Sequence, residues 1–165
     1  MAFHHLTDKF ALGKHCRMFH GPVVASEDAI IALVHVDGAH VMIHSDQRAP
    51  VARVMDLTTG LVDAALPLPG LENFEMPLNS VAGMIGADFP VPMEGERAFV
   101  FPRQNLSGMR MGALAGGLVF FADQLQVTLY ISSSRREAAA PFLRAHGYEV
   151  DTRSLWQRWF SKKAG

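Results

Sequence analysis

The alternation of apolar and polar residues is clearest over 29–46, which reads AIIALVHVDGAHVMIHSD. Two apolar runs flank the Asp37-Gly38 dipeptide, which favours two-residue type I′ turns. The pattern therefore predicts a β-hairpin in which His35 lies opposite His40. Alternate side chains of a strand share a face, so one face of this hairpin is fully apolar. The other face carries four potential ligands, His35, His40, Met42 and His44.

Similar alternation predicts further strands over 16–20, 97–102, 118–123 and 126–132. The Gly21-Pro22 pair is expected to end the 16–20 strand. The last two strands flank Gln124-Leu125 and are expected to form a second hairpin.

Helical spacing and end signals predict helices over 78–87, 134–146 and 153–163. The second of these begins with Ser134 and has Glu137 three residues later, which is the form of a capping box. It is expected to end before Gly147, because glycine is favoured just after the last turn of a helix.

These elements predict the α+β class, with one domain over residues 1–165. The expected architecture is a mainly antiparallel sheet with two β-hairpins and two or three helices packed on one face. Residues 153–165 are expected to form a short amphipathic C-terminal helix or tail. At 165 residues and 49% apolar content, the chain can bury a core without disulfides or metal.

Charge and cysteine content narrow the function classes. The formal net charge of −1 argues against a general nucleic-acid binder, which normally carries a basic excess. Cys16 is the only cysteine, so no disulfide can form within the chain. The N-terminus has no apolar run of signal-peptide length, and no run approaches the roughly 20 residues of a membrane-spanning helix. We therefore expect a cytoplasmic protein.

The first candidate site is a metal centre on the polar face of the 29–46 hairpin. His35, His40, Met42 and His44 would form it, with Cys16, Met18 and His20 beside them on the 16–20 strand. Imidazole, thiolate and thioether groups suit soft or borderline metals such as copper, zinc or haem iron. The alternative is an ordinary second face of a sheet, in which methionine fills gaps.

The second candidate lies where a strand gives way to a helix. Free backbone N–H groups together with Ser133, Ser134, Arg135 and Arg136 could hold a phosphate or carboxylate. Helix capping and solvated arginines explain the same residues without a ligand. Cys16 is a further possible nucleophile, although its neighbour His15 would point to the opposite face of a strand.

The third candidate is the C-terminal segment, in which aromatic and cationic residues are mixed. Trp156, Trp159 and Phe160 cluster at helical spacing, and Arg158 and Lys162 accompany them. Such a segment can dock on a protein partner or lie on an anionic membrane surface. Alternatively, the tryptophans cap the core of their own domain.

The leading interpretation is a non-enzymatic binding or regulatory module that acts through a protein partner or as a homo-oligomer. Walker, Rossmann, kinase and hydrolase-elbow patterns are absent from the sequence, which favours this interpretation over an enzyme. One alternative is a soft-metal binding protein that uses the hairpin histidines and methionine. Another is a small-molecule enzyme with a pocket near Cys16 or the 132–136 turn.

Overall fold

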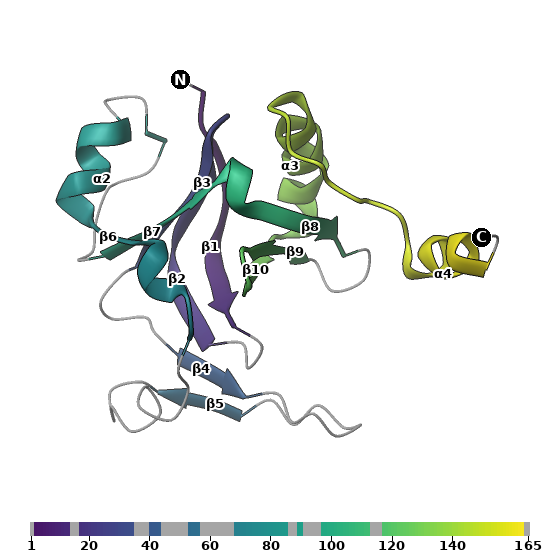
Figure 1. Ribbon diagram of the computed structural model, residues 1–165, viewed down its shortest axis with the longest axis horizontal. Helices are drawn as coiled ribbons and strands as arrows, with labels where there is room; N and C mark the ends of the chain where they lie inside the picture. The colour runs from purple at the N-terminus through teal and green to yellow at the C-terminus, as the bar shows by residue number, and fades with distance from the viewer. Residues whose placement is uncertain are drawn as a thin grey trace.

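The computed structural model of the chain describes residues 2–13, 17–34, 40–43, 53–56, 68–85, 89–90, 97–112 and 117–163 (Figure 1). The N-terminal strands are β1 (His4–Leu12), β2 (Arg17–Ala25), β3 (Ala29–Val34), β4 (His40–Ile43) and β5 (Arg53–Asp56). The later strands are β6 (Glu75–Pro77), β7 (Arg97–Pro102), β8 (Leu106–Met111), β9 (Gly117–Ala122) and β10 (Leu125–Tyr130). The α-helices are α2 (Leu78–Ile85), α3 (Ser133–Ala145) and α4 (Leu155–Lys163), and short 3-10 turns occupy Leu71–Asn73 and Arg103–Asn105.

All the named strands belong to one sheet. Eight of them follow the order β6-β7-β3-β2-β1-β10-β9-β8, and β4 and β5 branch from β2. Every pairing between named strands is antiparallel. The α+β class with an antiparallel sheet, predicted from the sequence, is confirmed.

The hairpin expected near residue 124 is present. Strands β9 and β10 pair with Ala122 opposite Leu125, so the turn is Asp123-Gln124, one residue earlier than expected. Asp123 has a φ of 50°, a left-handed conformation that aspartate tolerates better than most residues. The side-chain amide of Asn105 donates a 3.0 Å hydrogen bond to the Asp123 carboxylate. This bond connects the turn to the segment before β8.

The hairpin expected over 29–46 is wrong. Strand β3 pairs with Val23–Ala25 of β2, and β4 pairs with Arg17 and Met18 of the same strand, both antiparallel. β3 and β4 therefore run in the same direction along one edge of β2, whereas a two-residue turn would reverse the chain. The Asp37-Gly38 dipeptide itself lies outside the described residues. The local turn signal fails because β2 is long enough to accept both segments.

Strand β2 also continues past the point where it was expected to end. It runs through Gly21 and Pro22 to Ala25. The register between β1 and β2 shifts twice around Asp8, so the two residues fall in a bulged stretch where a missing proline N–H does not break the ladder. Strand β1, which sequence patterning did not identify, pairs with β2 along most of its length.

The apolar residues form two clusters. The larger combines Phe10, Phe19, Phe99, Phe101 and Phe120 with aliphatic residues from the strands and with Ala139 and Leu143 of α3. The smaller places Val81 and Ile85 of α2 against the alternate residues of β3 and β7. All six residues of β3 are buried, because its two faces contribute to different clusters. Each of these two helices thus packs on a face of the sheet, α3 with the larger cluster and α2 with the smaller.

The helices begin and end close to the expected positions. Helix α3 starts at Ser133 with Ser132 as its N-cap, so the expectation that Ser134 begins the helix in a capping box is wrong. Helix α4 stands away from the sheet at the end of an extended segment (Figure 1). Among the described residues, no helix has the length and apolar character needed to cross a membrane.

Candidate docking helix and adjoining groove

The segment that leads from α3 to α4 is attached to the rest of the molecule in several places. The first attachment is at the C-cap of α3, where Arg103 Nη1 donates a 2.9 Å hydrogen bond to the His146 carbonyl oxygen. A cation that donates to a free carbonyl at a helix C-terminus is favourable both as a hydrogen bond and through the helix dipole. Gly147 follows with a φ of 81°, which glycine adopts at little cost.

Tyr148 supplies the second attachment. Its side chain is buried, and its hydroxyl donates a 2.8 Å hydrogen bond to the carbonyl oxygen of Ser26. Burial raises the pKa of the Tyr148 phenol above its ordinary value of 10.0, while nearby Arg103 lowers it and Asp28 raises it further. The tyrosine therefore connects the loop after α3 to the turn between β2 and β3.

The third attachment is a short parallel bridge at the edge strand β8, in which Arg110 lies opposite Asp151. The Asp151 amide donates to the carbonyl of Met109 at 2.9 Å, and the Met111 amide donates to the carbonyl of Asp151 at 2.8 Å. The Asp151 carboxylate accepts two 3.0 Å hydrogen bonds from the Arg153 guanidinium. The chain is thus fixed on the sheet four residues before α4 begins.

Helix α4 begins with a reciprocal capping box. The Ser154 amide donates to Gln157 Oε1 at 2.8 Å, and the Gln157 amide donates to Ser154 Oγ at 3.2 Å. The signal for this cap is the sequence Ser-Leu-Trp-Gln at 154–157, which sequence analysis missed. The cap helps to explain why a nine-residue helix forms here, since isolated helices of this length are marginal in water.

Helix α4 exposes aromatic and polar residues alike. Trp159 and Phe160 are 56% and 62% exposed, while Ser161 and Lys162 line a groove against the domain. At 3.6 residues per turn, Ser161 lies about 160° around the helix axis from Trp159 and about 100° from Phe160. Lys162 lies about 160° from Phe160 but only about 60° from Trp159, so it shares a side of the helix with that tryptophan. Trp159 is not buried in the core, and the alternative that the tryptophans cap the core of their own domain stays a prediction. The Trp156 and Arg158 side chains lie outside the described residues.

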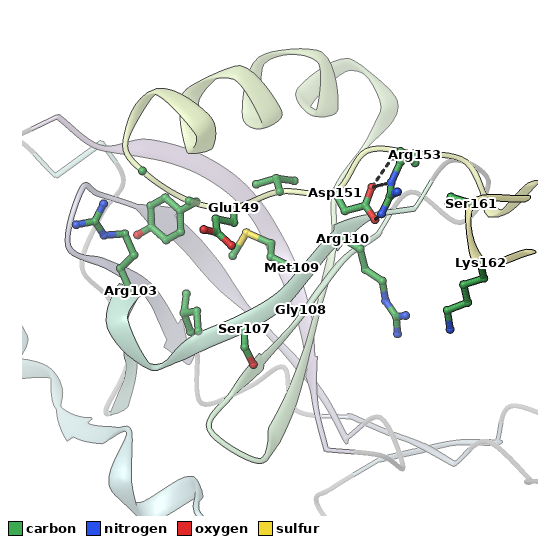
Figure 2. A pocket seen from close by; sticks show the side chains of 14 residues that line it. Arg103, Ser107, Gly108, Met109, Arg110, Glu149, Asp151, Arg153, Ser161 and Lys162 are labelled. Carbon is green, nitrogen blue, oxygen red and sulfur yellow. Dashed lines mark hydrogen bonds and ion pairs between the residues drawn. The ribbon is translucent and has the colours of Figure 1, made fainter. Parts of the chain in front are cut away.

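The groove lies between β8, the segment after α3, and α4, and has a volume of about 1170 Å³. Four cationic residues line it, Arg103, Arg110, Arg153 and Lys162, along with two acidic residues, Glu149 and Asp151. In Figure 2 the side chains of Arg110 and Lys162 extend in the same direction, away from α3. The residues that line the groove come from segments 103–110 and 147–162, which are far apart in the sequence.

The predicted metal set is only partly within the described residues. His40 pairs with Met18 across β4 and β2, so their backbones are adjacent, and Met18 is 2% exposed. His20 lies two residues further along β2. Cys16, His35 and His44 lie outside the described residues, as do the side chains of His40 and Met42. Within the part of the chain that the structure describes, no three His, Cys, Asp or Glu residues are grouped to hold a metal ion. The metal site remains a prediction.

At the predicted anion site the two arginines diverge. Arg135 Nη1 donates to the Asp8 carboxylate of β1 at 3.1 Å, and Arg136 Nη1 donates to the Gly112 carbonyl at 2.9 Å. Ser132 and Ser134 hydroxyls are 3.2 Å apart, and Ser133 and Ser134 are exposed. The arginines thus hold α3 against β1 and the end of β8, which is a structural role.

A histidine pair accompanies this contact between α3 and β1. The His4 ring stacks on Phe142 with 4.9 Å between centroids, and His146 stacks on Phe142 at 4.0 Å. His4 Nε2 is buried without a hydrogen-bond partner among the described residues. Burial lowers the pKa of His4 below its ordinary value of 6.5, and nearby His5 and Arg135 lower it further.

Comparison with known proteins gives no relative: the chain matches no protein-family model, no curated protein and no solved structure.

Proposed function

We propose that this protein is a non-enzymatic binding module that docks a protein partner on the aromatic side of α4. The observation that carries the proposal is the exposure of Trp159 and Phe160 on a helix that stands away from the sheet. An amphipathic helix that covered its own core would face the other way. Exposed aromatic residues on a capped helix are typical of helix-in-groove recognition.

Charge defines the kind of partner. Residues 152–165 contain four arginines and lysines and no aspartate or glutamate. Tryptophan and arginine are the residues that most often dominate binding energy at protein interfaces. The expected partner therefore has an apolar groove that accepts Trp159 and Phe160, surrounded by acidic side chains that complement the cations.

An anionic membrane is the other surface that fits aromatic and cationic residues. The groove argues against it, because its lining includes exposed Glu149, whose negative charge an anionic lipid surface would repel. A protein partner, unlike a uniformly anionic membrane, can place its acidic groups opposite the cations and away from the acidic residues of the groove. The cytoplasmic location expected from the sequence belongs to this proposal.

The test begins with capture of proteins from a cell extract on three full-length baits. These are the wild type, the double variant Trp159→Ala/Phe160→Ala, and Met84→Ala. Met84 is a matched control because it is 57% exposed but lies on α2. A true partner is retained by the wild type and the Met84 variant and lost by the double variant.

The candidate partner is then purified and titrated into the wild-type protein. Both tryptophans of the chain lie in α4, so intrinsic tryptophan fluorescence reports on this helix alone. Saturable binding with a shift of the emission to shorter wavelength supports the proposal. If no captured protein depends on the two aromatic residues, or if only anionic vesicles produce the shift, the proposal is wrong.

A further inference from the structure

The groove at the base of α4 contains two cations whose charges are not used by the fold. Arg103 donates to the His146 carbonyl, and Arg153 is held by Asp151. The Arg110 and Lys162 side chains make no hydrogen bond or ion pair with any described residue, although both line the groove. Their charges approach the same space from β8 on one side and from α4 on the other.

The rest of the lining is mainly polar. Ser107 is exposed and offers a hydroxyl to the groove, while Met109 and Val150 are buried and contribute little surface. The volume of about 1170 Å³ is close to the range of small-molecule sites, which is roughly 300–1,000 Å³.

We propose that this groove binds a phosphate-bearing small molecule, with Arg110 and Lys162 holding the phosphate group. A phosphate carries up to two negative charges and three acceptor oxygens, which matches two cations and one hydroxyl better than a single carboxylate does. Arginine can bind two phosphate oxygens at once, and lysine acts as a point charge.

The site and the proposed docking function use different residues of α4, because the phosphate is held by Lys162 and the partner by Trp159 and Phe160. The site also has a structural consequence. A phosphate held by both cations joins α4 to the edge strand β8, so the ligand would fix the helix that carries the aromatic residues.

The test uses the full chain and pyrophosphate as the probe, with isothermal titration calorimetry at fixed ionic strength. The variants are Arg110→Gln and Lys162→Gln, both at exposed positions, and circular dichroism confirms their fold. The matched control is Arg97→Gln, whose arginine is exposed in an ion pair with Glu75 on the far edge of the sheet. Citrate serves as a polyanion without phosphate.

The proposal predicts saturable binding of pyrophosphate that each groove variant weakens by about tenfold or more, since a hydrogen bond to a charged group contributes that much. Arg97→Gln should bind as the wild type does. In amide NMR spectra, the shifted resonances should lie in 106–111 and 161–162. Unsaturable binding, equal loss in Arg97→Gln, or citrate binding as tight as pyrophosphate binding would overturn the proposal.

Discussion

The Arg103 guanidinium closes the end of α3 by donating to the carbonyl oxygen of His146. With the Tyr148–Ser26 hydrogen bond and the Asp151 bridge to β8, it makes the link between α3 and α4 part of the folded domain. Helix α4 therefore begins from a fixed point, and its orientation follows from these contacts. The first two predictions concern these attachments.

Gly147→Ala should destabilise the protein. The residue has a φ of 81°, and an added Cβ would lie 2.0 Å from Arg103 Nη1. A left-handed conformation at a non-glycine residue costs about 1–3 kcal/mol, and displacement of Arg103 adds to it. Urea denaturation should show this loss. Gly83→Ala is the control: it lies inside α2 with open space around it, so it should raise stability by about 0.4–1 kcal/mol. Equal effects of the two variants on stability would contradict the claim that Gly147 is required at the end of α3.

Tyr148→Phe should lower the free energy of unfolding by about 1–3 kcal/mol at neutral pH, because the buried Ser26 carbonyl loses its donor. The variant should also change the response to alkaline pH. The folded state raises the pKa of Tyr148, so its contribution is complete below pH 10 and is lost as the pH rises above that value. The difference in stability between wild type and variant should therefore shrink above pH 10. A constant difference from pH 8 to pH 11 would refute this.

His4→Phe should flatten the dependence of stability on mildly acidic pH. The folded state lowers the pKa of His4, so its contribution is complete above pH 6.5 and is lost as the pH falls through the lowered folded-state value. Phenylalanine keeps the stack on Phe142 and cannot be protonated. Urea denaturation from pH 7.5 to pH 5 tests this. The wild type should lose more stability than the variant, and parallel losses would show that other groups are responsible.

Ser154→Ala should loosen α4 without affecting the sheet. Loss of the cap costs about 1 kcal/mol, which corresponds to about fivefold faster hydrogen exchange of the amides in that helix. The matched control is Ser132→Ala, since Ser132 is the N-cap of α3 but makes no side-chain capping bond. Its effect on the amides of α3 should be much smaller. Similar acceleration in both helices would show that the cap of α4 is not the cause.

The sequence predicts those elements whose signals are local. Strand β7 has the expected bounds, and the β9–β10 hairpin follows from alternation on both sides of a short turn. The Asp37-Gly38 signal misleads for the same reason, because turn propensity contains no information about β2 as an alternative pairing partner. Strand β1 escapes detection because its alternation is broken by the bulge around Asp8.

The sequence likewise shows one part of the candidate site and not the other. The aromatic cluster of the C-terminal segment is visible in the sequence, and the structure adds that Trp159 and Phe160 are exposed. The groove could not be predicted, because Arg110 and Lys162 are brought together by the Asp151 bridge and by the path of the chain after α3. Neither residue belongs to a recognisable motif.

The most direct test of the central claim is fluorescence quenching of Trp159 in the free protein. Trp156→Phe leaves Trp159 as the only tryptophan. Acrylamide quenching and the emission wavelength then report on one position of α4, at protein concentrations low enough to exclude self-association. The outward orientation predicts quenching comparable to that of free tryptophan amide and emission typical of water. Protected, short-wavelength emission from the folded monomer would show that Trp159 packs on its own domain, and would contradict the proposal that α4 docks a partner.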